Sequence, residues 1–524
     1  MKVFRFLIIA IILSSFIFTS GTRAAAAPPP FYYRYVTDDG ISSGDCPRNA
    51  PCELRYAIDD VALPEDIIIV HSGTYHSTIP SSELIFLDKT LTLKGSCEFD
   101  SSHPSICYPE EQNSILDAEN AKRVFRIQGT GVEEVSIEGF TITRGLGTDP
   151  APCFSTINGC GGGINAYNLE KLTLKNNYIW ANRAGSTDGV GGGLYAQNIN
   201  HLVVDNNTII FNQATDNGPG WGGGAMVFGS GGPHAVEFTN NLFYDNEIST
   251  ANTTSNSGGS IFIYQSNNIQ IIGNAFEYNN WIHQNVDLQG TSIFLFQNTG
   301  FFIEENTFTN DWGTSVVSVL DGGTSYNSIA RNKWWNNSVY RNIELQGQVN
   351  VDIINNFLGR QLLAPLSRGG SSTLIDIEGT SSDDRVDAGI YFNTFGAANF
   401  GIDIGSYADV NIFSNIFTDL TDPIQYTGSS SSYIIDTNLF HNYDVLGLDP
   451  SDYVNSVYAD PRLVDVANGD FHLLPNSGAI DKVFVSDFDR DIDGNPRPIG
   501  LGAIPYDLGA DEFAWRDYMP LISK

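Results

Sequence analysis

Short segments in which apolar side chains occupy every second position run through most of the chain. The segments 172–174, 202–204, 236–238 and 269–271 each carry apolar residues at their first and third positions. Such period-two patterning predicts β-strands with one buried face. Because each segment is short, we expect brief strands separated by sharp bends.

One segment near the N-terminus has a helical period instead. Leu54, Ala57, Ile58 and Val61 follow the i, i+3, i+4, i+7 spacing of an amphipathic helix. The apolar run at 66–70 then predicts the first buried strand. We therefore expect residues 52–62 to plug the N-terminal end of the strand-rich region.

An asparagine marks the strand pattern at intervals. Ten of them each precede a short pair that contains an aromatic or β-branched residue: Asn177, Asn207, Asn241, Asn274, Asn306, Asn332, Asn356, Asn393, Asn415 and Asn438. The intervals are 30, 34, 33, 32, 26, 24, 37, 22 and 23 residues, which predicts a solenoid rather than a globular core. Asparagine tolerates the left-handed backbone conformation, so we expect it at a corner between strands. Stacked from turn to turn, the amides would form a hydrogen-bonded ladder.

Glycine runs accompany the asparagines in the middle of the chain. They begin at Gly161, Gly191, Gly222 and Gly258, and the third residue of each run precedes the next marked asparagine by 14, 14, 17 and 14 residues. Glycine lets backbones approach closely or bulge before a strand. Each repeat therefore has a half of nearly constant length and a half of variable length.

Short strands that bend at these intervals resemble the coils of right-handed parallel β-helix proteins of the pectate-lyase type. The resemblance covers roughly residues 66–475. It implies an all-β fold, a single-stranded right-handed parallel β-helix solenoid with a short N-terminal capping helix and a small C-terminal cap module. Stacking supplies the core that one coil lacks. A β-propeller is the competing fold, but its blades of about 40 residues do not shrink to 22.

The first residues have the pattern of a secretory signal peptide. Lys2 and Arg5 precede the apolar run 7–18, and small residues follow at 24–27. We predict a signal peptide at 1–27, an N-terminal cap at 28–65, the β-helix at 66–475 and a C-terminal module at 476–524. The sequence predicts no transmembrane span in the mature chain, which we expect to be secreted, extracellular or held at the cell surface. A retained N-terminal anchor is the alternative.

Six cysteines fit an oxidising compartment. Their order along the chain suggests pairing between neighbours, closing three short loops: Cys46 with Cys52, Cys97 with Cys107, and Cys153 with Cys160. Other connectivities remain open from sequence. A zinc site is the functional alternative, although no Cys-x-x-Cys pair or nearby histidine completes a ligand set.

The charge is strongly acidic. The chain has 27 Lys and Arg against 60 Asp and Glu, a formal net charge of −33. Such a surface repels nucleic acid and favours solubility and cation binding. We therefore expect no nucleic-acid partner, and a glycan or cell-surface polysaccharide is the partner we consider.

Few basic side chains in the middle of the chain could serve in catalysis. A polysaccharide lyase needs a base and a cation to neutralise the uronate, and the candidates are Arg331, Lys333, Arg360 and Arg385. They do not share one position within the repeat, so scattered surface charge is the competing interpretation. A pectin-hydrolase pattern is incomplete, because Asp383-Asp384 is present without Gly-His-Gly.

Tryptophans are concentrated in the variable halves of the repeats or at the corners. They are Trp180, Trp221, Trp281, Trp312, Trp334 and Trp335. Aromatic platforms bind the apolar faces of sugars. The alternative is that these rings fill space between strands and loops.

The composition changes from Ala479 onward. Ala479-Ile480-Asp481 is followed by the segment 491–497, Asp-Ile-Asp-Gly-Asn-Pro-Arg, and then by 507–512, Asp-Leu-Gly-Ala-Asp-Glu. These elements resemble the choice-of-anchor Q module found at the end of secreted bacterial β-helix proteins. The resemblance covers about the last 60 residues and implies an extracellular or surface location, but no reaction.

Four alternating aspartates lie inside this module. Asp487, Asp489, Asp491 and Asp493 are spaced by two, which resembles the front of a calcium loop. Gly500 stands where an EF-hand has its bidentate glutamate, so an acidic turn is the alternative. Calcium is the one cofactor that the sequence suggests.

These patterns favour a non-catalytic function. We predict a secreted bacterial β-helix protein that acts as a surface or extracellular scaffold, adhesin-like and glycan-binding. The alternative is a carbohydrate-active enzyme, a calcium-assisted polysaccharide lyase. A lyase should bring carboxylates and a Lys or Arg together on one strand face, whereas a scaffold should not.

Overall fold

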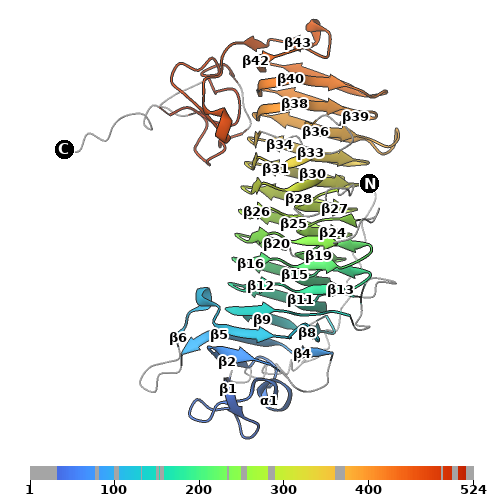
Figure 1. Cartoon of the computed structure of the whole chain (residues 1–524). Coiled ribbons are helices and arrows are strands. Elements are labelled where there is room, and N and C mark those ends of the chain that lie inside the picture. Colours follow the sequence, from blue (N-terminus) through green and yellow to red (C-terminus); the bar gives the residue numbers. More distant parts are fainter. Residues whose placement is uncertain are drawn as a thin grey trace, which may run out of the picture.

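The protein is an all-β parallel β-helix, as the repeat predicts (Figure 1). The computed structural model describes residues 32–76, 82–98, 106–131, 133–148, 153, 159–232, 235–249, 256–280, 289–359, 372–484, 488–498 and 505–514. Its strands fall into three stacked rows, each strand hydrogen-bonded in parallel to the strand one coil above and below. The buried apolar side chains form one continuous core from Val36 to Tyr453.

Row I and row II follow each other in every coil. Row I contains β4 (Glu83–Leu87), β8 (Arg123–Gln128), β19 (Ala225–Phe228), β24 (Ile261–Tyr264), β27 (Ile293–Phe296), β30 (Trp312–Leu320), β33 (Ser338–Gln346) and β36 (Thr373–Glu378). Row II contains β1 (Tyr33–Ile41), β2 (Ile67–His71), β5 (Leu91–Glu98), β9 (Glu134–Glu138), β20 (Val236–Thr239), β25 (Asn267–Ile272), β28 (Thr299–Glu304), β31 (Gly323–Ala330), β34 (Val349–Ile354), β37 (Val386–Tyr391), β39 (Ala408–Phe413), β41 (Ser432–Asp436) and β43 (Tyr453–Val454). Two long strands, β11 (Ile164–Lys175) and β15 (Leu194–Asp205), bend and belong to both rows.

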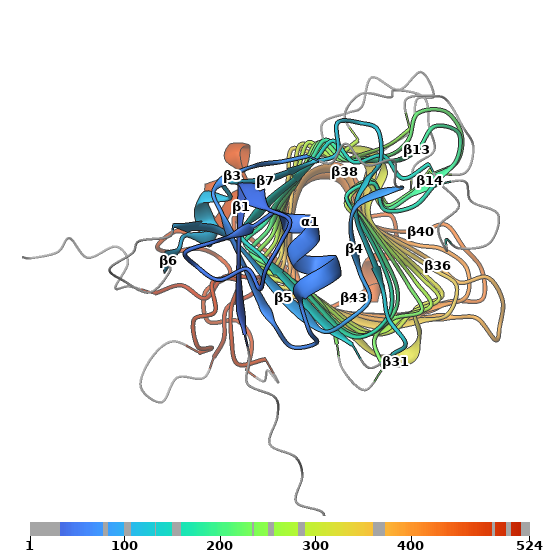
Figure 2. The same ribbon diagram turned by 90° about the horizontal axis from the view of Figure 1, so that it is seen from below.

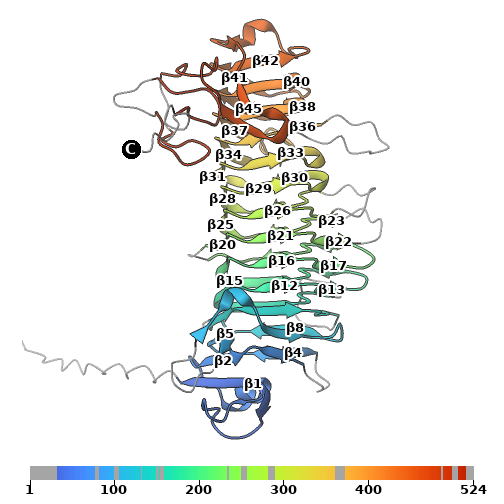
Figure 3. The ribbon, with the colours of Figure 1, turned by 60° about the vertical axis from the view of Figure 1, so that its left-hand side comes forward.

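Row III closes each coil. It contains β3 (Gly73–Tyr75), β7 (Ser114–Asp117), β10 (Phe140–Thr143), β12 (Tyr178–Trp180), β16 (Thr208–Ile210), β21 (Leu242–Tyr244), β26 (Ala275–Glu277), β29 (Thr307–Thr309), β32 (Lys333–Trp335), β35 (Phe357–Leu358), β42 (Leu439–Tyr443) and β44 (Val457–Tyr458). The strands β38 (Thr394–Ile404) and β40 (Ile416–Tyr426) begin in row III and end in row I. Short strands stack beside the coils (Figure 3): β13 (Arg183–Gly185), β17 (Gln213–Thr215), β22 (Glu247–Ser249), β14 (Gly189–Val190), β18 (Gly220–Trp221) and β23 (Asn256–Ser257).

The ten marked asparagines lie in one file at the corner between rows II and III. From Asn177 to Asn415, each donates its backbone N–H and its side-chain Nδ2 to the Oδ1 of the next member, over 2.8 to 3.1 Å. The file is buried along its whole length. It therefore satisfies backbone groups that a tight corner would otherwise leave unpaired.

The corner itself is made by the residue before each ladder asparagine. Those residues all have positive φ: Asn176, Asn206, Asn240, Gly273, Glu305, Arg331, Asn355, Phe392, Ser414 and Thr437. None of the ten ladder asparagines does. The expectation that the ladder asparagine takes the left-handed conformation is wrong, because its side chain must point along the helix axis while its neighbour makes the bend.

A second ladder runs along the corner between rows III and I. Five residues after each of six members of the first ladder lie Asn182, Asn212, Asn246, Asn279, Asp311 and Asn337. From Asn212 to Asn337, Oδ1 of each residue accepts the backbone N–H of the preceding member, over 2.8 to 3.2 Å. The constant offset of five residues is present in the sequence itself.

Asp311 is the one carboxylic acid among the six residues of this second ladder. It is buried and accepts from the backbone and the Nδ2 of Asn279 and from the hydroxyl of Ser292. Burial raises the pKa of Asp311 to about 7, although those hydrogen bonds offset part of the effect. The folded protein therefore holds a proton between about pH 4 and 7 that the unfolded chain has lost.

The Asp311→Asn variant should remove this pH dependence. The stability that comes from the raised pKa is fully present below about pH 4 and lost as the pH rises through about 7. We expect the variant to be more stable than the parent by about 2 kcal/mol at pH 8, and no more stable at pH 4. Denaturation midpoints across pH 4 to 8 measure this, and parallel curves for the two proteins would contradict it.

Stacked aromatic rings fill the core behind row III. Phe243, Phe276, Phe308 and Trp334 lie face to face with centroids 5.0, 5.0 and 4.9 Å apart. Trp334 is only 1% exposed. This part of the tryptophan pattern therefore reflects core filling.

A short helix covers the N-terminal end of the coils. One turn of α-helix, α1 (Leu54–Tyr56), continues into a π-turn, η1 (Ala57–Val61), and buries Leu54, Ala57 and Ile58. Along the axis, α1 lies across the mouth of the coils (Figure 2). The first strand is β1, which lies before this helix in sequence and pairs with β2. The sequence pattern predicts the first strand at 66–70, so the strands begin one element earlier than predicted.

The C-terminal region lies beside the coils. The antiparallel strands β45 (Leu463–Asp465) and β46 (Asp470–Leu473) lead into an irregular segment that packs on the side of the upper coils (Figures 1 and 3). The last coil is instead closed by the turn η3 (Pro450–Asp452) and by Leu446 and Leu448, which pack on the core. The remaining turns are η2 (Pro109–Glu111) and η4 (Val466–Asn468), and β6 (Ile106–Cys107) pairs with β5.

A buried arginine holds this C-terminal module together. Arg497 donates to the carbonyls of Gly509 (2.7 Å) and Asp507 (3.2 Å), and lies over the ring of Phe392 at 4.8 Å. The backbone N–H of Gly509 donates to the carbonyl of Ser414 at 2.8 Å. The motif residues therefore dock the module onto the coils.

All three cysteine pairs are disulfides as predicted: Cys46–Cys52, Cys97–Cys107 and Cys153–Cys160. Within the part of the chain that the structure describes, no helix has the length and apolar character to cross a membrane. The predicted signal peptide, residues 1–27, lies outside the described residues.

Candidate functional site

The outer surface of row I carries the most unusual collection of side chains. Because side chains alternate along each strand, every strand of row I presents two positions outward. One file, in register from coil to coil, consists of Tyr195, Met226, Phe262, Phe294, Ser318, Glu344, Asp376, Asp403 and Gln425. The other consists of Gln197, Phe228, Tyr264, Phe296, Leu320, Gln346 and Glu378. We call these two files together the row I surface.

Aromatic rings occupy the N-terminal half of the row I surface. Phe228, Tyr264 and Phe296 are half-buried and stack with centroids 5.3 and 5.1 Å apart. Phe262 and Phe294 stack behind them at 5.2 Å and are buried. The outermost rings thus form a partly exposed apolar strip parallel to the helix axis.

Carboxylates occupy the C-terminal half. Glu344, Asp376 and Asp403 lie on three consecutive strands in direct register. The guanidinium of Arg341 contacts Glu344 at 3.4 Å and also bonds Asp376. Acidic groups and one cation therefore meet on a single strand face.

Each of these carboxylates has its own partners. Glu344 accepts from the hydroxyls of Ser315 (2.9 Å) and Ser318 (3.1 Å). Asp403 accepts from Thr427 Oγ1 (2.7 Å) and Gln425 Nε2 (2.9 Å). These bonds fix the carboxylates in defined orientations.

The environments of Asp376 and Asp403 differ. Burial raises the pKa of Asp403, and the negative charge of Asp376 raises it further, while the bonds from Thr427 and Gln425 offset part of the rise. Asp376 instead holds the guanidinium of Arg341. The raised pKa of Asp403 suits that carboxyl group to act as an acid.

The predicted lyase residues lie in other places. Arg331 sits at the corner between rows II and III and pairs with Glu304 (2.8 Å) and Glu305 (2.9 Å). Arg385 pairs with Asp409 at 2.8 Å, and Lys333 reaches the C-terminal module. Arg360 lies outside the described residues. Arg331, Lys333 and Arg385 do not come together, and each forms an ion pair with a carboxylate.

The site residues of row I escaped the sequence analysis. Their signal is an acidic residue between two inward apolar residues, at 343–345, 375–377 and 402–404. The pattern recurs in three consecutive coils, but the distances to the marked asparagines vary. Asp383 and Asp384, considered for a hydrolase, lie in an exposed loop next to Thr380 and Ser381.

The tryptophans divide between core and surface. Trp312 and Trp334 are buried, while Trp180, Trp221 and Trp335 are half-buried. Trp281 lies outside the described residues. None of the described five belongs to the aromatic strip of the row I surface, which consists of Phe and Tyr.

The four alternating aspartates do not share one set of partners. The carboxylate of Asp491 accepts the backbone N–H groups of Asp493 (3.0 Å) and Asn495 (2.7 Å) and so holds its own turn. Asp493 turns to Lys333 (3.1 Å) and His472 (2.8 Å). Its bond to His472 lowers the pKa of Asp493 to about 2 and raises that of His472 to about 9. Asp489 is exposed, and Asp487 lies outside the described residues.

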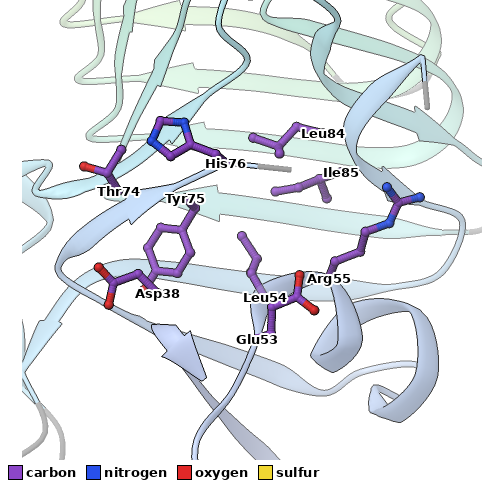
Figure 4. Close-up of a pocket in the computed structure, with 9 residues that line it drawn as sticks. All are labelled: Asp38, Glu53, Leu54, Arg55, Thr74, Tyr75, His76, Leu84 and Ile85. Atoms are coloured by element: carbon purple, nitrogen blue, oxygen red, sulfur yellow. The ribbon is translucent and has the colours of Figure 1, made fainter. Parts of the chain in front are cut away.

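A hollow next to the N-terminal helix is also lined by polar side chains (Figure 4). There, Arg55 pairs with Asp59 at 3.0 Å, and the hydroxyl of Tyr75 donates to the carbonyl of His71 at 2.8 Å. His76 faces Glu119 at 3.6 Å. These contacts stabilise the N-terminal end of the coil stack. The residues named here do not form an arrangement of nucleophile, base and oxyanion donors.

Comparisons with known proteins bear on the fold. A family model described as "Right handed beta helix region" matches residues 95–256, and no curated protein matches the chain. Pectate lyase Pel9A is 13% identical with a TM-score of 0.32, and the match covers 92% of this chain and 97% of that one. A PL6 alginate lyase solved with a trisaccharide is 13% identical (TM-score 0.38, 83% and 90%). PfbA, a surface adhesin of Streptococcus pneumoniae, is 11% identical (TM-score 0.19, 72% and 82%).

Proposed function

We propose that the protein binds a polysaccharide along the row I surface. One observation carries the proposal: consecutive coils present a stacked aromatic strip and, in line with it, three carboxylates with Arg341. Rings of Phe and Tyr bind the apolar faces of sugars, and carboxylates accept hydrogen bonds from hydroxyl groups. A linear surface of this kind fits an extended chain of sugars.

The charge of the surface favours a ligand that is not a polyanion. Arg341 pairs with Glu344 and Asp376 on this part of the surface. Asp403 and Glu378 add further negative charge on the neighbouring positions. The whole chain has a formal charge of −33. Repulsion would disfavour a densely acidic glycan, so the substrate class is a neutral or weakly charged polysaccharide.

A second function, cleavage of the glycosidic bond, is favoured by the convergence of the carboxylates. Asp403, with its raised pKa, would serve as the acid that protonates the leaving oxygen. Asp376, held by Arg341, would serve as the second carboxyl group of the pair. A lyase fits less well, because Arg341 is engaged by two carboxylates and is not placed to remove a proton.

The location that we propose is extracellular. Three disulfides fit an oxidising compartment, and residues 1–27 have the pattern of a signal peptide. We propose that residues 476–524 form a choice-of-anchor Q module. Within this module, Arg497 donates hydrogen bonds to carbonyls of the segment 507–512. These bonds support a structural role for the arginine of the motif.

Truncation of the aromatic strip tests the binding function. Tyr264→Ala and Phe296→Ala should each weaken affinity for a bound polysaccharide about three- to tenfold, because each ring contributes about 0.5–1.5 kcal/mol of stacking. Titration calorimetry and affinity electrophoresis against a panel of neutral and acidic polysaccharides measure the change.

The control is an exposed aromatic on another face. Tyr326 of β31 is 53% exposed in row II, so Tyr326→Ala should leave the affinity unchanged. Equal losses in all three variants, or no binding to any polysaccharide of the panel, would count against the proposal.

A further inference from the structure

Three segments of the C-terminal module meet around an imidazole. His472 lies on β46, Asp493 lies in the turn after Ile492, and Asp511 lies in the final described segment. One ligand atom from each of these side chains lies within 4.8 Å of the other two. The three residues also line a common hollow.

A third carboxylate, that of Asp470, orients the imidazole. The Nδ1 of His472 bonds Oδ1 of Asp470, which leaves Nε2 facing Oδ2 of Asp493 at 2.8 Å. A carboxylate on the far nitrogen of a histidine is the usual outer support of a metal ligand, since it fixes the ring and the tautomer. This arrangement is more specific than a cluster of acidic residues.

The side chain of Asp511 is buried. It is 8% exposed, and its Oδ2 accepts the backbone N–H of Leu473 at 2.7 Å. The nearby basic side chains pair with other carboxylates, Lys333 with Asp493 and Arg497 with Glu512. Burial of a carboxylate without full compensation costs free energy, and a bound cation would supply the compensation.

The charges around the hollow leave room for a cation. Asp470, Asp493, Asp511 and Glu512 line it. Arg497 pairs with Glu512 at 3.5 Å and also donates to carbonyls of the module. Lys333 pairs with Asp493, and His472 pairs with Asp470 and Asp493. The carboxylates thus outnumber the cations that serve them.

We infer that His472, Asp493 and Asp511 bind a divalent transition-metal cation of the Zn²⁺ type, with Asp470 as the support of His472. An imidazole nitrogen together with carboxylate oxygens suits Zn²⁺. Calcium prefers six to eight oxygen ligands, which this set does not offer. The ion would link β46, the turn at 493 and the segment 505–514, and its remaining coordination position would face the hollow. This site is independent of the row I surface.

Metal titration of the full mature chain tests the inference. After treatment with a chelator and dialysis, calorimetry should show one Zn²⁺ bound per chain, and bound metal should raise the melting temperature by mass action. His472→Gln and Asp493→Asn should each weaken binding at least 100-fold. Asp470→Asn should weaken it about 10- to 100-fold, as for other outer supports.

Two further variants separate metal binding from a purely structural role. Lys333→Ala removes the cation that competes for Asp493, so it should tighten Zn²⁺ binding although it deletes an ion pair. His441→Gln is the matched control, because His441 is also a half-exposed histidine facing a carboxylate, Asp460 at 3.9 Å. It should leave the affinity unchanged.

Three results would overturn the inference. They are binding of Zn²⁺ well below one equivalent, an affinity in His472→Gln equal to that of the parent, and a larger rise in melting temperature with Ca²⁺ than with Zn²⁺ at the same concentration. Loss of binding in His472→Gln with tighter binding in Lys333→Ala would support it.

Discussion

Asn241→Leu should lower the free energy of unfolding by about 2–5 kcal/mol, because it removes several buried hydrogen bonds at once. Oδ1 of Asn241 accepts from the backbone and Nδ2 of Asn207 at 2.8 and 3.1 Å. Its Nδ2 donates to the carbonyl of Val204 at 2.8 Å and to Asn274 at 2.9 Å. Leucine has a similar volume but replaces none of these bonds, so buried polar groups in two neighbouring coils lose a partner.

The effect should be larger than that of an outward-facing asparagine. Asn411 lies on the outside of β39 and is half-exposed, so Asn411→Leu should change stability by less than about 0.5 kcal/mol. Chemical denaturation followed by circular dichroism measures both. Equal midpoints for the two variants would contradict a stabilising function of the ladder.

Asp403→Asn should reduce cleavage of a bound polysaccharide by about 10²–10⁴-fold while leaving its affinity nearly unchanged, since a general acid contributes that much to rate. The amide keeps the hydrogen-bonding contacts to Thr427 or Gln425 in part but cannot donate a proton to a leaving oxygen. Measurement of new reducing ends, alongside binding, separates the two effects.

The pH profile and a control variant refine this test. Because the pKa of Asp403 is raised, activity should persist to higher pH than with an ordinary aspartic acid and then fall as that proton is lost. Asp409, which pairs with Arg385 on row II, supplies the control Asp409→Asn, with unchanged rate. Release of unsaturated uronides would instead indicate a lyase. Binding without any cleavage would leave the scaffold as the function of the row I surface.

Much of the fold was readable from the residues alone. The recurring asparagines specify corners because a buried amide that bridges one coil to the next is needed at the same place in every coil. The helix at 54–61 and the three disulfides were also predictable, because periodicity and pairing of near neighbours are local properties. Even the second ladder, five residues after the first, is written in the sequence.

The site was not readable in the same way. Glu344, Asp376 and Asp403 are in register only because each coil closes at its own length, and the loops that set this length vary from repeat to repeat. Distance along the chain therefore does not report which side chains stand above one another.

The sequence by itself determined a solenoid with marked corners, since alternation and corner residues act within a few positions of the chain. The tertiary structure alone decided which outward side chains share a face, and it placed the C-terminal module beside the coils, where Lys333 meets Asp493. Those outcomes depend on stacking and docking between segments far apart in sequence, where register is set by the sum of all the intervening loops.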